Sequence, residues 1–574
     1  MHPDRYPCLV RSGGLQPLRN LTRDALRVVV ALLLAGQASG AHALYDPTKE
    51  YVESSAVAAR YPDPPVDIPT PAFKPGRSDF TSQEELIAFV DALASRASDL
   101  RVRIVGTSQE SRAIPLLIFA RPAVPDGSEL AKNGKPTVLM IGQQHGNEPA
   151  GGEAALALAS ELASRGVASE ILERVNVLIV PRANPDGAYH FIRGLANGAD
   201  VNRDHLLLGT PEGQALSRVF VEYQPDVVLD CHEFGVKLRW FEKFGSLQKY
   251  DALIQYATVS NLPSAITEAS ERMFRQPLLR AFEHARLTHS WYYTSSYNMD
   301  DRTVSMGGVV PDTGRNIAGL RNAVSFLLET RGVGIGRAHY KRRVYTHLTA
   351  IRSILVSTAE NADALLTVGR RVRQQVASAA GGGEIVVAGA PTMTRHTLEL
   401  IDPQTGADKA VEVEWRDALE IQARLVRSRP GGYLLPASEA GAVRRLRALG
   451  ATVLRLLEDS ELDVERYRIT RAEEAKKEDV RSNDEEGSVS VVRITSVTER
   501  AAVTAHRGDF YIPLDQPLAN VIIAALEPDT QSSYAANRVL NLPRAGAGND
   551  AILPLYRLPA RLGTRALVWD GGGP

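Results

Sequence analysis

Residues 141–152 read Ile-Gly-Gln-Gln-His-Gly-Asn-Glu-Pro-Ala-Gly-Gly, and the fold and chemistry of the chain are organised around them. The apolar run 138–141 is typical of a short buried strand, and the Ala/Leu-rich segment 153–163 predicts a helix. His145 and Glu148 are therefore expected on a loop at the carboxyl end of a strand, where open α/β sheets bind ligands. An imidazole and a carboxylate three residues apart on such a turn can reach one metal ion, at about 2 Å each. The alternative interpretation is a surface loop with an incidental His and Glu.

Strand-like and helix-like patterns alternate between residues 100 and 375. Continuously apolar runs, typical of strands buried on both faces, lie at 116–118, 138–141, 175–180, 227–229 and 325–328. Helical segments are predicted at 153–165, 212–222 and 347–378, and Ser82 with Glu85 predicts a capping box at the start of a further helix. The alternation predicts an α/β fold with a mixed, largely parallel sheet flanked by helices.

Residues 1–43 have the pattern of a signal peptide. Arginines between 19 and 27 precede a short apolar core at 28–35, and Ala-His-Ala at 41–43 fits a cleavage site. The core is shorter than the roughly 20 residues of a membrane span. An uncleaved anchor or a plain helix is the alternative. The pattern predicts an exported protein, periplasmic or extracellular, with no membrane span after cleavage.

The 574 residues are enough for two or three domains. Residues 44–78 are rich in proline and are predicted to form an extended arm. The α/β domain is expected to span 79–380, and the glycines that follow Ala380 are typical of a linker. Residues 384–574 predict a smaller accessory domain of α+β type, rich in strands. Its predicted elements are short strands at 384–387, 397–401, 411–415, 421–425 and 452–456, a helix at 438–449 and a charged, solvated loop at 471–486.

Composition narrows the classes of partner. The net charge of −1 provides no field that would favour nucleic acid or an anionic membrane, so neither is expected as a partner. Apolar and charged contents of 44% and 23% are ordinary for a soluble globular protein. Of the two cysteines, Cys8 would leave with the signal peptide and Cys231 would remain as a single thiol. The mature chain is therefore expected to hold no intrachain disulfide. The sequence does not indicate an oligomeric state.

Polar side chains also follow three further predicted strands. The segment after 177–180 carries Arg193, Asp200, Asn202 and Arg203, the strand 227–231 ends in His232, and the strand 325–328 ends in Glu329. Charged residues directly after apolar strands are costly to bury without a partner. Four such ends on one sheet predict a shared pocket.

The residue types suggest a catalytic metal site. His145, Glu148 and His232 would form a His₂Glu set with an open fourth position, the arrangement of a catalytic site for one zinc ion. Zinc lowers the pKa of bound water to about 7, and Glu329 is placed to take a proton from it. His232 beside Glu233 could instead be a structural pair.

The remaining polar residues are candidates for substrate binding. Arg193 and Arg203 would supply donors for a developing oxyanion and a substrate carboxylate, with Asn202 as a further amide donor. Asp200 would hold the far nitrogen of a ligand histidine, or would only cap a turn. Arg182 is a rival to Arg193, and Arg203 could form a surface pair with its neighbour. The histidines interpreted as structural or exposed are His190, His205, His284, His289 and His339.

With these motifs in place, the chain resembles the M14 zinc carboxypeptidases, the carboxypeptidase A family. Residues 145–148 match its HxxE motif, residues 184–187 its NPDG turn, and residues 193–203 resemble its bacterial R-x-N-A-N-G-V-D-L-N-R segment. The resemblance covers roughly 80–375. It implies a peptide substrate with a free C-terminal carboxylate held by Asn202 and Arg203, with Arg193 at the scissile carbonyl. It also implies that His232 is the third zinc ligand and Glu329 the general base.

The chain departs from the family pattern in two places. Leu195 replaces the usual Asn, and the tyrosine that closes over substrate has no clear match, Tyr297 being the nearest candidate. Arg315 and Asn316 would line the side-chain pocket or serve a structural role. The rival functions are a zinc amidohydrolase of the aspartoacylase and desuccinylase type, a cell-wall peptide amidase, and a non-catalytic peptide-binding protein.

Overall fold

The computed structural model describes residues 44–124, 126–164, 166–477, 489–543, 551–563 and 565–571. The predicted signal peptide and Cys8 lie outside these residues. All of these described residues belong to one compact unit. None of the described helices is both long enough and apolar enough to cross a membrane.

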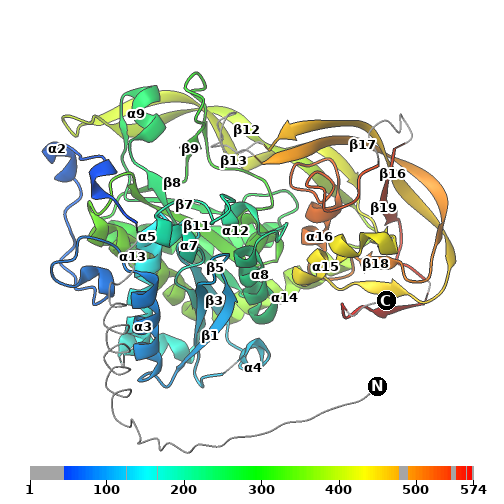
Figure 1. Ribbon diagram of the computed structural model, residues 1–574, viewed down its shortest axis with the longest axis horizontal. Coiled ribbons are helices and arrows are strands. Elements are labelled where there is room, and N and C mark those ends of the chain that lie inside the picture. The colour runs from blue at the N-terminus through cyan, green and yellow to red at the C-terminus, as the bar shows by residue number, and fades with distance from the viewer. Residues whose placement is uncertain are drawn as a thin grey trace, which may run out of the picture. The chain divides into compact units, whose positions relative to one another are not determined.

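An eight-stranded sheet lies at the centre of the α/β region (Figure 1). Its strands, in spatial order, are β1 (Leu100–Thr107), β2 (Ala113–Phe119), β4 (Asn176–Val180), β3 (Thr137–Ile141), β5 (Val227–Gly235), β11 (Val324–Val333), β7 (Ala252–Tyr256) and β8 (His289–Trp291). The pairs formed by β3 with β4, β3 with β5, β5 with β11 and β7 with β8 are parallel, and the other three are antiparallel. The predicted mixed sheet is therefore confirmed.

Helices cover both faces of this sheet. One face packs on α3 (Gln83–Ala94), α5 (Pro149–Ala163) and α13 (Tyr340–Glu360), and the other on α8 (Pro211–Tyr223) and α12 (Gly314–Leu320). The five predicted strand runs fall in β2, β3, β4, β5 and β11, and the capping box of Ser82 and Glu85 is present. The predicted helix 347–378 is in fact α13 followed by α14 (Ala362–Ser378), because the chain leaves the helical conformation at Asn361.

The C-terminal region contributes long and short strands to two sheets, one of which also includes three short strands from residues 247–305. A five-stranded sheet has the order β6 (Leu247–Gln248), β12 (Glu384–Ile401), β13 (Asp408–Ser428), β10 (Val304–Ser305) and β9 (Thr294–Ser295). A seven-stranded sheet has the order β17 (Ser490–Ala505), β16 (Ser460–Lys476), β19 (Ile552–Leu558), β14 (Gly432–Leu435), β18 (Phe510–Pro513), β15 (Leu454–Leu456) and β20 (Ala566–Val568). Helices α15 (Ala440–Ala448) and α16 (Ala519–Leu526) contribute to the same core as this sheet.

Two predictions for this region were wrong in detail. The four short strands predicted between 384 and 425 are two long strands, β12 and β13, whose pairing continues across irregularities in register. The charged run 471–486 is not wholly a loop, because residues 471–476 continue β16 and pair with β17. Opposite charges on these exposed strands can pair, as Glu473 does with Arg471 at 2.7 Å, so a charged composition did not exclude a strand. Residues 478–488 lie outside the described part of the chain.

The Pro-rich arm is tied to the end of β11 by a buried ion pair. The side chain of Glu53 is 2% exposed and pairs with Arg331, and His339 Nε2 lies 2.9 Å from its second oxygen. Burial alone would raise the pKa of Glu53, but hydrogen bonds from His339 and Arg331 outweigh it and lower that pKa to about 2. Arg331 is two residues beyond Glu329, so this pair fixes the arm beside the predicted base.

We expect Glu53→Gln to lower the free energy of unfolding by about 3 kcal/mol at pH 7. Because the folded-state pKa lies below the unfolded one, the ion pair stabilises the fold above about pH 4.3, and this contribution is lost as the pH falls toward 2. Urea unfolding at pH 7 and pH 3 measures the difference. Glu129→Gln is the matched control, because Glu129 only pairs with the exposed Lys132. A penalty of equal size at both pH values would contradict the prediction.

Candidate metal centre

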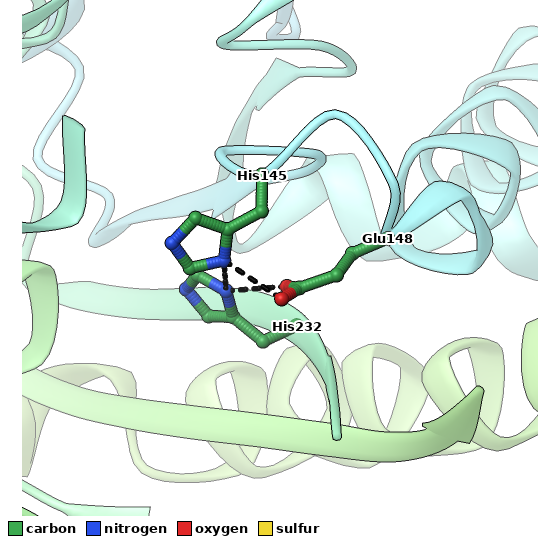
Figure 2. Close-up of side chains that lie close together, drawn as sticks. All are labelled: His145, Glu148 and His232. Carbon is green, nitrogen blue, oxygen red and sulfur yellow. Dashed lines mark hydrogen bonds and ion pairs between the residues drawn. The ribbon is translucent and has the colours of Figure 1, made fainter. Parts of the chain in front are cut away.

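The loop after β3 and the middle of β5 bring three predicted ligands together (Figure 2). Glu148 lies at the N-cap of α5, and Pro149 begins that helix. His145 Nδ1 lies 2.9 Å from Glu148 Oε1, and His232 Nδ1 lies 2.9 Å from Glu148 Oε2 and 3.0 Å from His145 Nδ1. All three side chains are at most 2% exposed. Residues far apart in the sequence therefore converge on one point.

Close backbone packing holds the loop of the first two ligands. A Cβ atom on Gly146 would lie only 1.8 Å from the carbonyl carbon of Gly187, so a larger residue would displace the loop. Gly187 belongs to the Asn-Pro-Asp-Gly segment, which begins helix α7 (Pro185–His190), and the side chain of the N-cap residue Asn184 accepts its backbone N–H at 2.8 Å. Asn184 also donates to Gly194 O at 3.0 Å. The Asn-Pro-Asp-Gly segment thus joins the ligand loop to the segment that carries Arg193.

The cluster has the chemistry and spacing of a zinc site. Two ligands bound to zinc at about 2 Å in a tetrahedral arrangement lie about 3.3 Å apart. The three facing atoms of this cluster are separated by 2.9, 2.9 and 3.0 Å. Two imidazole nitrogens and one carboxylate are also the donor set of catalytic rather than structural zinc sites. These residues therefore fit a zinc ion.

Neighbouring groups leave Nδ1 of His145 available as a ligand. Its Nε2 lies 3.0 Å from Asp200 Oδ1, as predicted for a carboxylate that orients a ligand histidine. Arg193 Nη1, which can only donate, lies 3.2 Å from His145 Nδ1. Both contacts require the proton of the ring to be on Nε2. Loss of solvent around the half-buried Asp200 carboxyl would raise its pKa, but Arg193 and His145 hold that pKa well below the usual range.

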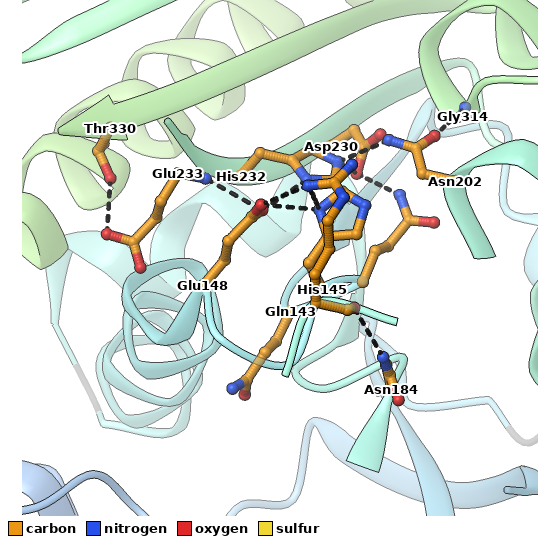
Figure 3. A network of polar contacts seen from close by, with 12 residues as sticks. Gln143, His145, Glu148, Asn184, Asn202, Asp230, His232, Glu233, Gly314 and Thr330 are labelled. Atoms are coloured by element: carbon orange, nitrogen blue, oxygen red, sulfur yellow. Dashed lines mark hydrogen bonds and ion pairs between the residues drawn. The ribbon is translucent and has the colours of Figure 1, made fainter. Parts of the chain in front are cut away.

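His232 has a carboxylate partner of its own. Its Nε2 lies 2.9 Å from Asp230 Oδ1, on the same strand two residues earlier. Burial would lower the pKa of His232, but the Asp230 and Glu148 carboxylates outweigh it and raise that pKa well above the ordinary value. Asn202 Nδ2 is 2.9 Å from the same nitrogen, and Asn202 Oδ1 accepts Gly314 N–H at 2.7 Å (Figure 3). The Asn202 amide is thus engaged by the protein, and its predicted role toward a substrate stays a prediction.

Glu329 lies on the strand next to His232. The parallel pairing of β5 and β11 sets Glu329 directly opposite His232, on strands that run about 4.8 Å apart. Residues opposite each other in a sheet present their side chains on the same face, so the Glu329 carboxylate shares the face of the metal cluster. It is 2% exposed. Its role as general base stays a prediction.

The three candidate arginines have different partners, and Arg193 contacts a metal-ligand candidate. Arg193 Nη1 donates to Glu148 Oε1 at 3.0 Å, and Nη2 donates to Asp200 at 2.9 Å. Arg203 is half-buried and donates to Asn202 O at 2.6 Å. Arg182, the rival to Arg193, is buried and donates to the Gln143 side chain at 2.7 Å and to a backbone carbonyl. Arg193 is therefore the better candidate for the oxyanion role.

Other candidates named from the sequence have different surroundings. Tyr297 is exposed, and the Arg239 guanidinium stacks 4.6 Å from the centre of its ring. Arg315 is buried and donates to Gly308 O at 2.8 Å, while Asn316 accepts from Thr258 N at 2.9 Å. Contacts of this kind hold a loop in place. Of the histidines set aside, His190 pairs with Glu110 and His339 with Glu53, and Cys231 is a buried free thiol.

A buried ion pair on the opposite face of β5 was not predicted. Glu233, next to His232, accepts from Arg343 Nε at 2.7 Å and from Ala150 N at 2.9 Å. It also accepts from Thr330 Oγ1 at 3.3 Å (Figure 3). Its backbone N–H donates to Glu148 Oε2 at 3.1 Å. Arg343 is on α13, more than a hundred residues along the chain from Glu233, so no local sequence signal could have linked the two.

Comparison with known proteins agrees with the geometry. Residues 86–304 match the family model described as zinc carboxypeptidase. A protein of Trichophyton verrucosum (strain HKI 0517), named "Probable carboxypeptidase 2", is 30% identical over 382 residues, 66% of this chain and 73% of that protein. "Carboxypeptidase 2" of Trichophyton equinum is 28% identical over 512 residues, 86% of this chain and 93% of that protein. The chain belongs to the zinc carboxypeptidase family.

This membership makes the chain a hydrolase that acts on peptide bonds. The matched segment contains the three metal-ligand candidates as well as Arg193, and it ends before Glu329. Among solved structures, a metallo-carboxypeptidase from Burkholderia cenocepacia is similar at 20% identity and a TM-score of 0.37, covering 49% of this chain and 70% of that one.

Proposed function

We propose that the protein is an exported zinc metallocarboxypeptidase that removes C-terminal amino acids from peptides. The observation that carries the proposal is the convergence of His145, Glu148 and His232 within about 3 Å of one another, with Glu329 on the same sheet face. Zinc held by such a set activates water and polarises the substrate carbonyl. The division into a peptidase domain, 79–380, and an accessory domain, 384–574, is part of the same proposal.

Each polar residue around the cluster has a role in this reaction. The Glu329 carboxylate accepts the proton of the attacking water and passes it to the leaving amine. Arg193 donates to the oxygen on which negative charge develops, and its pairing with Asp200 holds the guanidinium in position. Arg203 and Asn202 bind the free carboxylate at the end of the substrate. Binding that carboxylate restricts cleavage to the last peptide bond.

Two rival functions have less support. An amidohydrolase that acts on small acylated amino acids would use a similar metal set, but the relatives that match most of this chain bear carboxypeptidase names. A non-catalytic peptide-binding protein has no use for a buried glutamate facing the metal cluster. A cell-wall peptide amidase is consistent with export and with the same residues. The substrate panel below separates it from a general carboxypeptidase.

We expect the purified mature chain, loaded with zinc, to release single C-terminal amino acids from peptides with a free carboxylate. Peptides of the same sequence with an amidated C-terminus should remain intact, because they offer Arg203 no charge. Mass spectrometry of the products measures both, and a chelator should abolish release until zinc is restored. Cell-wall stem peptides belong in the panel as a separate class. Zinc-loaded protein that leaves every free-carboxylate peptide intact would contradict the proposal.

A further inference from the structure

A chain of buried polar side chains extends from His232 into the protein interior. Asp230 Oδ1 lies 2.9 Å from His232 Nε2 and accepts from Gln144 Nε2 at 2.5 Å. Gln144 Oε1 lies 2.8 Å from His205 Nε2. The exposed fractions of these side chains are at most 4%. Neither the proposed reaction nor the motif that matches the family uses Gln144 or His205.

The two hydrogen bonds of Gln144 determine its amide orientation and the tautomer of His205. Since the Asp230 carboxylate accepts from Gln144, the amide oxygen of Gln144 must face His205, whose Nε2 then carries the proton. At the other end, His232 Nε2 lies 2.9 Å from both Asp230 Oδ1, which accepts, and Asn202 Nδ2, which donates, so these two contacts favour opposite tautomers of the ring. Asp230 favours the tautomer with the proton on Nε2, which leaves the lone pair on Nδ1, the atom that faces Glu148 at 2.9 Å. Gln144 and His205 thus hold in place the Asp230 carboxylate. That carboxylate supports the tautomer of His232 that binds a metal through Nδ1.

The same hydrogen bonds also connect the two segments that carry the metal-ligand candidates. Gln144 directly precedes His145 on the loop after β3, whereas Asp230 shares β5 with His232. The bond from Gln144 to Asp230 therefore crosses from the segment of the first ligand to the segment of the second. A Cβ on Gly314 would lie 2.6 Å from Asp230 Oδ2 and 3.2 Å from His205 Nε2, so α12 closes directly over this bond.

We propose that Asp230, Gln144 and His205 are positioning residues that hold His232 in the tautomer and orientation needed to bind zinc. The inference rests on the proposed metal site. Partners on the far nitrogen of a ligand histidine raise its basicity and fix its ring, and their loss costs about 10–100-fold in metal affinity. Asp200 has the equivalent position at His145, so Nε2 of each ligand imidazole contacts a carboxylate.

The test is zinc affinity, measured for the full mature chain by competition with a chelator, together with the absorption spectrum of the cobalt-substituted protein. We expect Asp230→Asn to raise the zinc Kd about 10–100-fold. Gln144→Leu removes the hydrogen bonds to the Asp230 carboxylate and to His205, and His205→Phe removes one neutral hydrogen bond. Each change should raise the zinc Kd by up to about tenfold. All three should shift the cobalt spectrum, because the geometry at His232 relaxes.

A rescue variant and a control separate positioning from general stability. His205→Gln keeps a donor that can reach Gln144 Oε1 and should restore wild-type affinity and spectrum, an outcome that a merely structural role for the imidazole does not predict. Asp226→Asn removes a carboxylate that accepts Thr137 N–H at 3.0 Å just before β5, at the end away from the ligands. We expect it to leave zinc affinity unchanged.

The outcomes distinguish the two proposals. Wild-type protein that binds no zinc would overturn the metal site and this inference together. Wild-type protein that binds zinc while the Gln144 and His205 variants match it in affinity and spectrum would overturn this inference alone. The His205 variants leave Asp230 and all three ligands in place, so the test remains decisive if Asp230→Asn does not fold.

Discussion

Glu329→Gln is expected to lower kcat about 10²–10⁴-fold while zinc content and KM stay close to wild type. The amide cannot accept a proton from the attacking water, but it has nearly the size and shape of the carboxylate. Glu329 is not one of the three side chains that converge as metal-ligand candidates, so zinc should remain. Single-turnover hydrolysis of a free-carboxylate peptide, with zinc measured on the same sample, gives both quantities.

Glu153→Gln provides the matched control for this change. Glu153 is also a buried glutamate, on α5, but its oxygens accept from Ala72 N at 3.1 Å and Thr81 Oγ1 at 2.6 Å. We expect this variant to keep wild-type kcat. Full activity of the Glu329 variant would exclude Glu329 as the base, and would leave the metal cluster without an assigned proton acceptor. Loss of zinc from that variant would instead make Glu329 part of the metal site.

The metal cluster could be predicted from the sequence because its residues come directly after apolar runs, although β5 and β11 continue past His232 and Glu329 to Gly235 and Val333. His145 and Glu148 follow β3, and Glu329 lies in β11 directly opposite His232. In parallel strands, carboxyl ends meet at the same edge of the sheet, so the positions along the chain were sufficient to bring these groups together. The strands themselves were recognisable because each is buried on both faces and is therefore continuously apolar.

The buried polar residues next to the metal-ligand candidates were harder to predict from the sequence. Glu233 and Arg343 pair across more than a hundred positions, and Gln144 meets Asp230 through a contact between two separate segments. Only Asp230 left a local signal, since a strand places residues two apart on the same face and so sets Asp230 beside His232. His205 was interpreted as structural or exposed because it has no such neighbour in the sequence.

The C-terminal strands show a second reason why sequence patterns fail to identify structure. β12 and β13 are mostly exposed or half-exposed along their length, so they lack the alternation that identifies a strand with one buried face. Short apolar stretches were visible, and the polar residues between them were interpreted as breaks. Pairing between the two strands continues through those residues, including Thr394 opposite Trp415. Pairing of this kind is a tertiary contact that local composition does not encode.

Arg193→Ala is expected to lower kcat about 10²–10³-fold, with a much smaller change in KM. The Arg193 guanidinium lies 3.0 Å from Glu148 Oε1 and is held by Asp200 at 2.9 Å, so its donors are aimed at the cluster before substrate arrives. A donor fixed in this way acts mainly on charge that develops in the transition state, and its loss therefore appears in kcat. Steady-state kinetics on one free-carboxylate peptide measures the two constants separately.

Arg193→Lys and Arg218→Ala complete this comparison. Lysine keeps the charge but not the two-pronged geometry that reaches both Glu148 and Asp200, so it should recover only part of kcat. Arg218 donates to Val105 O at 3.0 Å in an exposed position, and its loss should change neither constant. Zinc affinity must be measured in the Arg193 variants, because Asp200 also contacts His145 at 3.0 Å. A rise in KM with unchanged kcat would assign Arg193 to substrate binding and not to the oxyanion.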